Sequence, residues 1–309
     1  MFLSLYLPIS GNAVNILLLL GLGGAVGFLS GLFGVGGGFL MTPLLIMAGI
    51  PPTVAAASDS NQIVAASTSG TYAHYRMGNV DFKMGTFLLI GGVVGGTLGV
   101  QLIKVLRAMG NADFVIKITY VVMLGVIGFY MFVESLQSMR QKVPERKPAE
   151  PSRPSVYARL LQALPWQMKF DKSGVTLSPL LPLILGVFVG VLAAIMGVGG
   201  GFIMVPVMVY MLRMPMHVVV GTSLFQILFT CINVTIMQAI TNFTVDLVLA
   251  IILLLGSTLG VQFGARLSRR LKADHLKILL ASIVLVVMFQ ILVGLIWPPH
   301  HLLAYKGGH

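Results

Sequence analysis

Gly34–Pro43 reads GVGGGFLMTP, and Gly197–Pro206 reads GVGGGFIMVP. Each glycine run lies within an otherwise apolar stretch, and each is followed by a phenylalanine and then a proline. Glycine permits tight turns and close backbone approach because it has no Cβ atom. The two decapeptides therefore predict two breaks in the helical backbone, one in each half of the chain.

The composition places these breaks in a membrane. Hydrophobic residues make up 57% of the chain and charged residues only 9%, whereas a soluble domain carries about 25% charge. A bilayer core takes about 20 apolar residues per helix, which predicts an all-α polytopic membrane protein of about ten segments. The expected segments are 13–33, 35–49, 53–74, 84–105, 114–134, 179–196, 199–212, 216–240, 245–265 and 276–297, the second and seventh being short. The first has no basic residues before it and no Ala-x-Ala site after it, so we expect a retained helix and no cleaved signal peptide.

The basic residues predict how the segments are oriented. If all ten segments cross, the loops on one side hold sixteen of the 20 Lys and Arg residues and the other side holds four. If the second and seventh do not cross, the division is eleven to nine and carries no bias. The positive-inside rule favours the first arrangement, with the central linker cytoplasmic and both termini outside. The same rule accounts for the net charge of +11 without a nucleic-acid partner.

Three parts are expected along the chain: an N-terminal membrane repeat (1–134), a linker (135–178) and a C-terminal membrane repeat (179–309). The linker contains SMRQKVPERKPAEPSRPS, which is too charged and proline-rich to form a packed core. The repeats align over much of their length. Matching pairs are Phe39 with Phe202, Pro43 with Pro206, Pro52 with Pro215, Ser60 with Ser223, Asn79–Asp81 with Thr244–Asp246, and Gly96–Gln101 with Ser257–Gln262.

Five segments per half is an odd number, so the second copy would enter the membrane from the opposite face. This predicts an inverted repeat, an arrangement in which secondary transporters bind substrate where broken helices meet near the midplane. The short segment after each glycine run would direct its N-terminal N–H groups and partial positive charge at the turn, which suits an anion. The alternative is close helix packing, which also explains the glycines spaced four apart at Gly92 and Gly96 and at Gly256 and Gly260.

The paired glycine motifs, VVVGTSLFQ at Val218–Gln226, the two TLGVQ elements and the basic linker resemble the TauE/SafE family. This family of sulfite exporter-like proteins is also called the toluenesulfonate uptake permease family. The resemblance implies transport of sulfur-containing anions such as sulfite, sulfoacetate or other organosulfonates, mainly outward across the bacterial cytoplasmic membrane. One departure is SDSNQ at Ser58–Gln62, which is more polar than GTSLFQ in the second half.

Polar side chains inside apolar segments are candidates for substrate binding, because each is costly in lipid. Together with the turns they make up the predicted site: Gly34, Gly36, Gly37, Gly38, Gly197, Gly199, Gly200, Gly201, Ser60, Asn61, Gln62, Thr222, Ser223, Gln226, Gln101 and Gln262. Asp59 is a candidate for carrying a coupling proton, or alternatively for an interhelical hydrogen bond. Asp81, Asp113 and Asp246 stand where carboxylates cap helices.

His74 and Arg76 end the third segment and either attract substrate at the cytoplasmic mouth or anchor the helix at the interface. The sequence predicts no cofactor and no metal site, and an enzyme is disfavoured because HExxH, GxSxG and a cysteine–histidine set are missing. The expected function is export of a small anion by alternating access. The alternative is a channel, or import of a different organic anion. The sequence does not determine whether the protein forms a homo-oligomer.

Overall fold

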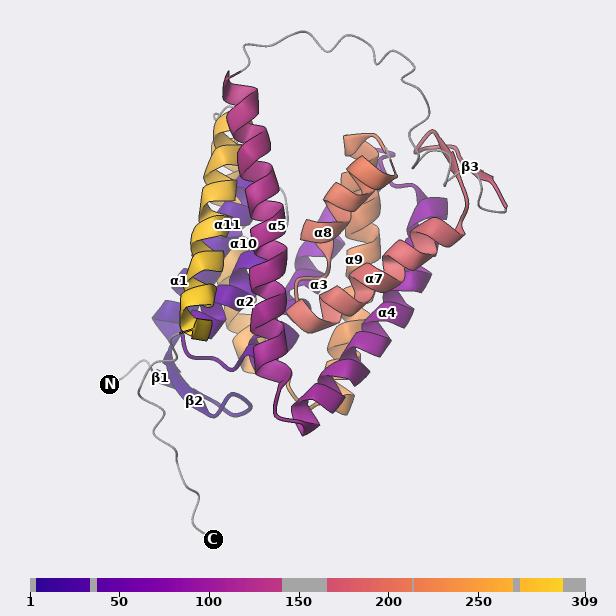
Figure 1. Ribbon diagram of the computed structural model, residues 1–309. Coiled ribbons are helices and arrows are strands. Elements are labelled where there is room, and N and C mark those ends of the chain that lie inside the picture. Colours follow the sequence, from indigo (N-terminus) through magenta and orange to yellow (C-terminus); the bar gives the residue numbers. More distant parts are fainter. Residues whose placement is uncertain (1–3, 34–37, 141–165, 213, 269–272, 297–309) are drawn as a thin grey trace.

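A computed structural model describes residues 4–33, 38–140, 166–212, 214–268 and 273–296, shown in Figure 1. The helices are α1 (Ile16–Phe33), α2 (Gly38–Met47), α3 (Pro52–Arg76), α4 (Phe82–Ala108), α5 (Ala112–Arg140), α7 (Leu180–Met196), α8 (Gly201–Pro206), α9 (Met216–Thr241), α10 (Leu247–Ser268) and α11 (Ala273–Ile296), with a π-helical turn η1 (Val207–Met211) after α8. The strands form two antiparallel hairpins, β1 (Ser4–Leu7) with β2 (Asn12–Asn15) and β3 (Met168–Phe170) with β4 (Val175–Leu177).

The fold is an all-α polytopic membrane fold, as the composition predicted. Each of the ten expected segments contains a helix. Within the described residues, five helices are long and apolar enough to cross a membrane, and three shorter apolar stretches accompany them, 16–30, 38–47 and 180–196. The number of segments that cross remains a prediction.

The two halves of the chain are intertwined and do not form two separate bundles. The first helix of each half packs along the fourth helix of the other half, so that α1 contacts α10 and α7 contacts α4. α3 packs against α9, and α5 against α11. Every major helix pair therefore joins one half to the other.

Glycines set the closest of these approaches. A Cβ atom on Gly27 of α1 would lie 2.3 Å from the Ser257 carbonyl oxygen of α10, and one on Gly95 of α4 would lie 2.0 Å from the Val187 carbonyl oxygen of α7. Gly256 and Gly260 of α10 likewise face the backbone of α1. Small residues at helix interfaces allow such close contact in membranes. Cβ atoms on Gly92 and Gly96 would lie 2.5 Å from Thr230 Oγ1 and 3.0 Å from Val234 Cγ2 of α9. The packing interpretation is therefore confirmed for the predicted pairs Gly92 with Gly96 and Gly256 with Gly260.

An aspartate fastens each hairpin to the start of a helix of the other half. In the Asp81 latch, Oδ1 of Asp81 caps α4 by accepting from the Met84 N–H, Oδ2 accepts from the N–H and hydroxyl of Ser173, and the Asp81 N–H donates to Thr222 Oγ1.

The Asp246 latch repeats this pattern at the start of α10. Its Oδ1 accepts from the Leu249 N–H, its Oδ2 accepts from the Ile9 N–H at 3.4 Å, and its own N–H donates to Ser58 Oγ at 3.0 Å. Both predicted caps are therefore confirmed, and each also ties the two halves together. The third predicted aspartate, Asp113, accepts from the Thr53 N–H at the start of α3 instead.

Three parts of the sequence prediction differ from the structure. α5 continues to Arg140, six positions beyond the expected end of the first repeat. Residues 168–177 of the expected linker form the β3–β4 hairpin, in which Phe170 is fully buried and stacks edge-on to Phe87. The first segment was expected from residue 13, but β2 occupies 12–15 and α1 begins at Ile16. Residues 141–165 of the linker lie outside the described residues.

We expect Gly95→Ala to destabilise the fold by about 1–3 kcal/mol, the cost of overpacking a filled interface. The added methyl would strike the rigid Val187 carbonyl, which cannot move without the α7 backbone. Thermal unfolding in detergent measures this change. Gly21→Ala on α1 is the control, since no atom lies within 4 Å of its Cβ position. Equal unfolding temperatures for the two variants would contradict the packing account.

Candidate functional site

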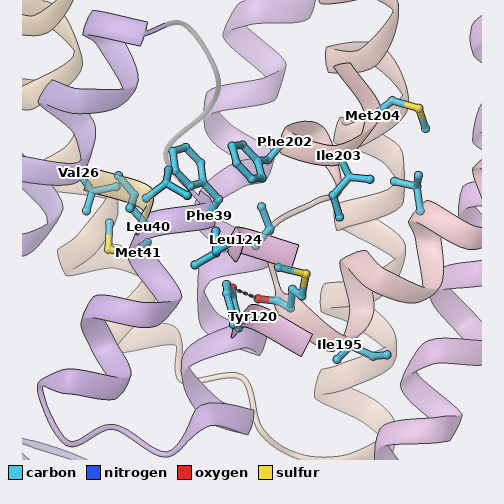
Figure 2. Close-up of a cluster of buried hydrophobic side chains, with 14 of the residues drawn as sticks. Val26, Phe39, Leu40, Met41, Tyr120, Leu124, Ile195, Phe202, Ile203 and Met204 are labelled. Carbon is cyan, nitrogen blue, oxygen red and sulfur yellow. Dashed lines mark hydrogen bonds between the residues drawn. The ribbon is translucent and has the colours of Figure 1, made fainter. Parts of the chain in front are cut away.

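The two glycine motifs meet each other in the interior of the protein. Phe39 of α2 and Phe202 of α8, which follow the two glycine runs, stack with ring centroids 4.4 Å apart and planes inclined by 12° (Figure 2). A Cβ atom on Gly38 would lie 3.4 Å from the Cα of Val198, so the backbones also come close. Two breaks separated by more than half the sequence therefore form one locus.

The second glycine run is a left-handed turn between two helices. Gly197, Gly199 and Gly200 have φ angles of 71°, 68° and 77°, a region that side chains other than glycine rarely adopt. α7 ends at this turn and α8 begins at Gly201, and residues 193–204 around the turn are all buried. In the first run Gly38 begins α2, whereas 34–37, including predicted Gly34, Gly36 and Gly37, lie outside the described residues.

The prolines of the motifs leave two carbonyl groups without their usual helical donors. Pro43 and Pro206 lie inside α2 and α8, four positions after Phe39 and Phe202. Because proline has no N–H, it cannot donate to the carbonyl four residues earlier. The stacked phenylalanines thus each carry a backbone carbonyl that lacks its i+4 donor. The helix after Pro206 continues as the π-turn η1, a rearrangement associated with functional sites.

Asp59 on α3 is buried beside this locus. The carboxylate is fully buried, and its Oδ2 accepts a hydrogen bond of 2.8 Å from the Thr42 hydroxyl of α2. An interhelical hydrogen bond, one of the two roles expected for Asp59, is therefore present. Its Oδ1 is also buried and has no hydrogen-bond partner in the part of the chain that the structure describes.

Tyr120 of α5 links the same region to the end of α7. Its ring is fully buried, its hydroxyl lies close to Thr42, and it donates to the Met196 carbonyl, the interaction dashed in Figure 2. Neither Thr42 nor Tyr120 was selected from the sequence. The signal was present, because Thr42 interrupts the apolar part of the first motif and Tyr120 places a hydroxyl in the middle of an apolar helix.

Of the polar residues predicted in the first half, Ser60 contacts the second glycine turn. The Ser60 hydroxyl donates to the Gly197 carbonyl at 3.3 Å and to Ala56 of its own helix at 3.1 Å, which joins α3 to the second glycine run. Gln62 is buried with Oε1 unpartnered among the described residues, while Asn61 is half-buried.

The predicted residues of the second half lie mostly away from the turn. Thr222 is part of the Asp81 latch, and the Ser223 hydroxyl donates to Val220 of its own helix. Gln226 is buried against α4, where its Nε2 donates to Thr230 Oγ1 and its Oε1 has no partner among the described residues. Gln101 and Gln262 are exposed on α4 and α10, so the structure does not bring them into the central cluster.

At the end of α3, the His74 side chain touches Gly221 of α9, and Arg76 is exposed. A cavity of about 270 Å³ lies between the β1–β2 turn, the start of α3 and the α4–α5 turn, and none of its lining residues belongs to the glycine motifs. Arg107 and Asp113 line it, and Nη1 of Arg107 donates to the Asn242 carbonyl. The cavity is therefore at one end of the helices and not at the locus where the motifs meet.

Comparison with known proteins identifies the family. The model of the sulfite exporter TauE/SafE family matches residues 19–291 of the chain, including both glycine motifs. The chain belongs to the TauE/SafE family.

Its relatives in this family are named as membrane transporters. Probable membrane transporter protein YjnA of Bacillus subtilis is 29% identical over 84% of this chain and 93% of its own length. YunE of the same organism is 22% identical over 90% and 98%. Sulfite exporter TauE/SafE family protein 2 of Arabidopsis thaliana is 31% identical over 31% of this chain and 21% of its own. No solved structure gives a significant match. The protein is thus a multi-pass membrane transporter of the TauE/SafE family.

Gly197→Ala tests whether the turn depends on glycine. The substitution adds strain at φ 71° and places Cβ 2.0 Å from the Ala56 carbonyl oxygen, so we expect loss of folded protein in detergent size-exclusion chromatography. Gly110→Ala has a similar φ of 73° but open space around Cβ, and it isolates the backbone cost of about 1 kcal/mol. A folded Gly197→Ala protein as stable as Gly110→Ala would refute the close contact.

Proposed function

We propose that this protein is a secondary transporter that exports small sulfur-containing anions, namely sulfite, sulfoacetate or related organosulfonates, by alternating access. The observation that carries the proposal is the meeting of the two glycine motifs, one from each half, at the Phe39–Phe202 stack. Transporters with broken helices bind substrate where the breaks of the two halves meet. The names of the relatives favour sulfite or a related anion.

The anion would be held by backbone N–H groups at the starts of α2 and α8, where helix ends carry partial positive charge. Gly38 and the glycines of 197–201 have no side chains and would let the anion approach the backbone closely enough for this contact. Ser60, Asn61 and Gln62 are neutral side chains whose hydrogen bonds to the anion would break and re-form as the halves move. Such a site suits an oxyanion that must dissociate again on the other side.

An inverted repeat is supported by the duplicated contacts. The hairpins with their latches occur once per half, and Figure 1 places β1–β2 and β3–β4 at opposite ends of the helices. The pairing of α1 with α10 matches that of α7 with α4. With the positive-inside orientation, β3–β4 and the linker would face the cytoplasm and β1–β2 the outside of a bacterial cytoplasmic membrane.

Alternating access would then open one latch at a time. The Asp81 latch closes the proposed cytoplasmic end and the Asp246 latch the opposite end, with the stacked phenylalanines between them. The cavity at Arg107 would serve as the outer vestibule through which the anion leaves. An inside-negative potential favours anion export by about 2.3 kcal/mol per charge per 100 mV.

Proteoliposomes containing the purified protein should release labelled sulfite or sulfoacetate at a saturable rate. An inside-negative potential should increase the efflux, since the substrate is an anion. Protein-free liposomes are the control. Flux that does not saturate would indicate a channel, and absence of flux for both anions would refute the proposed substrate class.

Asp81→Asn should favour the state of the protein that is open to the cytoplasm, and Asp246→Asn should favour the state that is open to the outside. Asparagine still caps a helix, but at Asp81 it weakens the charge-assisted bonds to Ser173. The native Cys231 reports opening, because it is buried and a Cβ atom on Gly199 would lie 2.6 Å from its Sγ. An impermeant maleimide should label Asp81→Asn faster from the cytoplasmic face and Asp246→Asn faster from outside. The same change in both variants would contradict the two-latch mechanism.

A further inference from the structure

We propose that Asp59, Thr42 and the C-terminal end of α7 form a binding site for a monovalent metal cation of the sodium type. The site itself stands on the geometry around Asp59, while the coupling of the cation to anion export rests on the proposed function. A cation in this place would differ from the coupling proton that the sequence suggested for Asp59.

Charge balance requires a partner for Asp59. The carboxylate is fully buried inside a membrane protein, and the Thr42 hydroxyl that donates to it is neutral. No salt bridge to it occurs within the described residues. An ionised carboxylate without a counter-charge is very costly in a low-dielectric interior. Either a proton or a bound cation must therefore neutralise it.

One oxygen of Asp59 is available to bind the cation. Oδ2 already accepts from Thr42, whereas the buried Oδ1 has no hydrogen-bond partner among the described residues. A carboxylate oxygen binds a metal cation through its lone pairs, and those of Oδ1 are not used by a hydrogen-bond donor within the described part of the chain.

The surroundings are rich in oxygen acceptors. The end of α7 is joined to the neighbours of Asp59: Tyr120, whose hydroxyl lies close to Thr42, donates to the Met196 carbonyl, and Ser60, the next residue on α3, donates to the Gly197 carbonyl. A carbonyl oxygen has two lone pairs, so each can accept a further contact. The last carbonyls of a helix also carry partial negative charge, which attracts a cation.

The ligand chemistry specifies the class of ion. Carboxylate, hydroxyl and carbonyl oxygens bind hard cations. A single carboxylate balances one positive charge, which selects a monovalent ion over calcium or magnesium. Unwound backbone and half-helix C-terminal ends bind sodium in other transporters with broken helices.

The cation would also resolve an electrostatic conflict in the proposed transport site. Asp59 lies beside the locus where the anion is expected, and a bare carboxylate would repel that anion. A bound cation neutralises Asp59 and leaves the helix N-termini free to attract the substrate. Anion binding should therefore be tighter when the cation is present.

The test is thermal unfolding of the purified protein in detergent, without any anion substrate, as choline chloride is replaced by sodium chloride at constant ionic strength. A ligand that binds only the native state raises the unfolding temperature in a saturable way. We expect such a rise for the native chain and none for Asp59→Asn. Thr42→Val should raise the half-saturating sodium concentration about tenfold or more, since it removes a hydrogen bond to the charged group.

Thr42→Ser keeps the hydroxyl and should behave like the native chain. Thr119→Val on α5 is the matched control, because the Thr119 hydroxyl donates only to its own helix, at Val115. A stability that follows pH but is the same in sodium and choline would overturn the proposal in favour of a proton. Sodium stabilisation that persists in Asp59→Asn or is unchanged in Thr42→Val would also overturn it. Failure of sulfite flux alone would count against the proposed function, since no anion enters this measurement.

Discussion

The arrangement of this protein depends on one constraint, that backbone polar groups inside a bilayer must be satisfied by the protein itself or by a water-filled cavity. Two breaks in the helices violate regular hydrogen bonding within an apolar chain, and lipid cannot compensate for them. The second break is buried and partly satisfied by the protein, because Ser60 and Tyr120 donate to the carbonyls at the end of α7. The four helix pairs that join the two halves, together with the Phe39–Phe202 stack, hold the two glycine motifs against each other.

The crossed pairing of the halves makes the breaks mechanically sensitive. α1 and α10 pack backbone to backbone through glycines, as do α4 and α7, so each pair can move as a stiff unit. At the helix starts these units are joined to their neighbours by polar contacts, the Asp81 and Asp246 latches. Hydrogen bonds of this kind can be replaced by hydrogen bonds to water at a modest cost in free energy. Separation of the glycine interfaces would instead expose tightly packed backbone. Rearrangement is therefore expected between units and not within them.

Sequence patterns predicted the features that depend on local chemistry. Apolar run length placed the helices, and small residues four apart marked the packed faces, because both follow from the bilayer itself. The caps at Asp81 and Asp246 were predicted from position, but their bonds to Ser173 and Ile9 were not, since these join residues far apart in the chain. Exposure of Gln101 and Gln262 was missed for the same reason: a polar residue in an apolar segment shows neither which way its helix face turns nor what covers it.

The proximity of Phe39 to Phe202 likewise required the tertiary structure, although the repeat itself was visible. In the proposed alternating-access mechanism the two halves move against each other, so Phe39 and Phe202 must separate during transport. The most direct test of this separation is efflux from proteoliposomes by a variant with Phe39→Cys and Phe202→Cys in a Cys231→Ser background, measured before and after oxidative cross-linking. Cross-linking is expected to stop efflux, and reduction of the cross-link is expected to restore it. Oxidant should not change efflux by either single-cysteine variant. Undiminished efflux through fully cross-linked protein would contradict the mechanism.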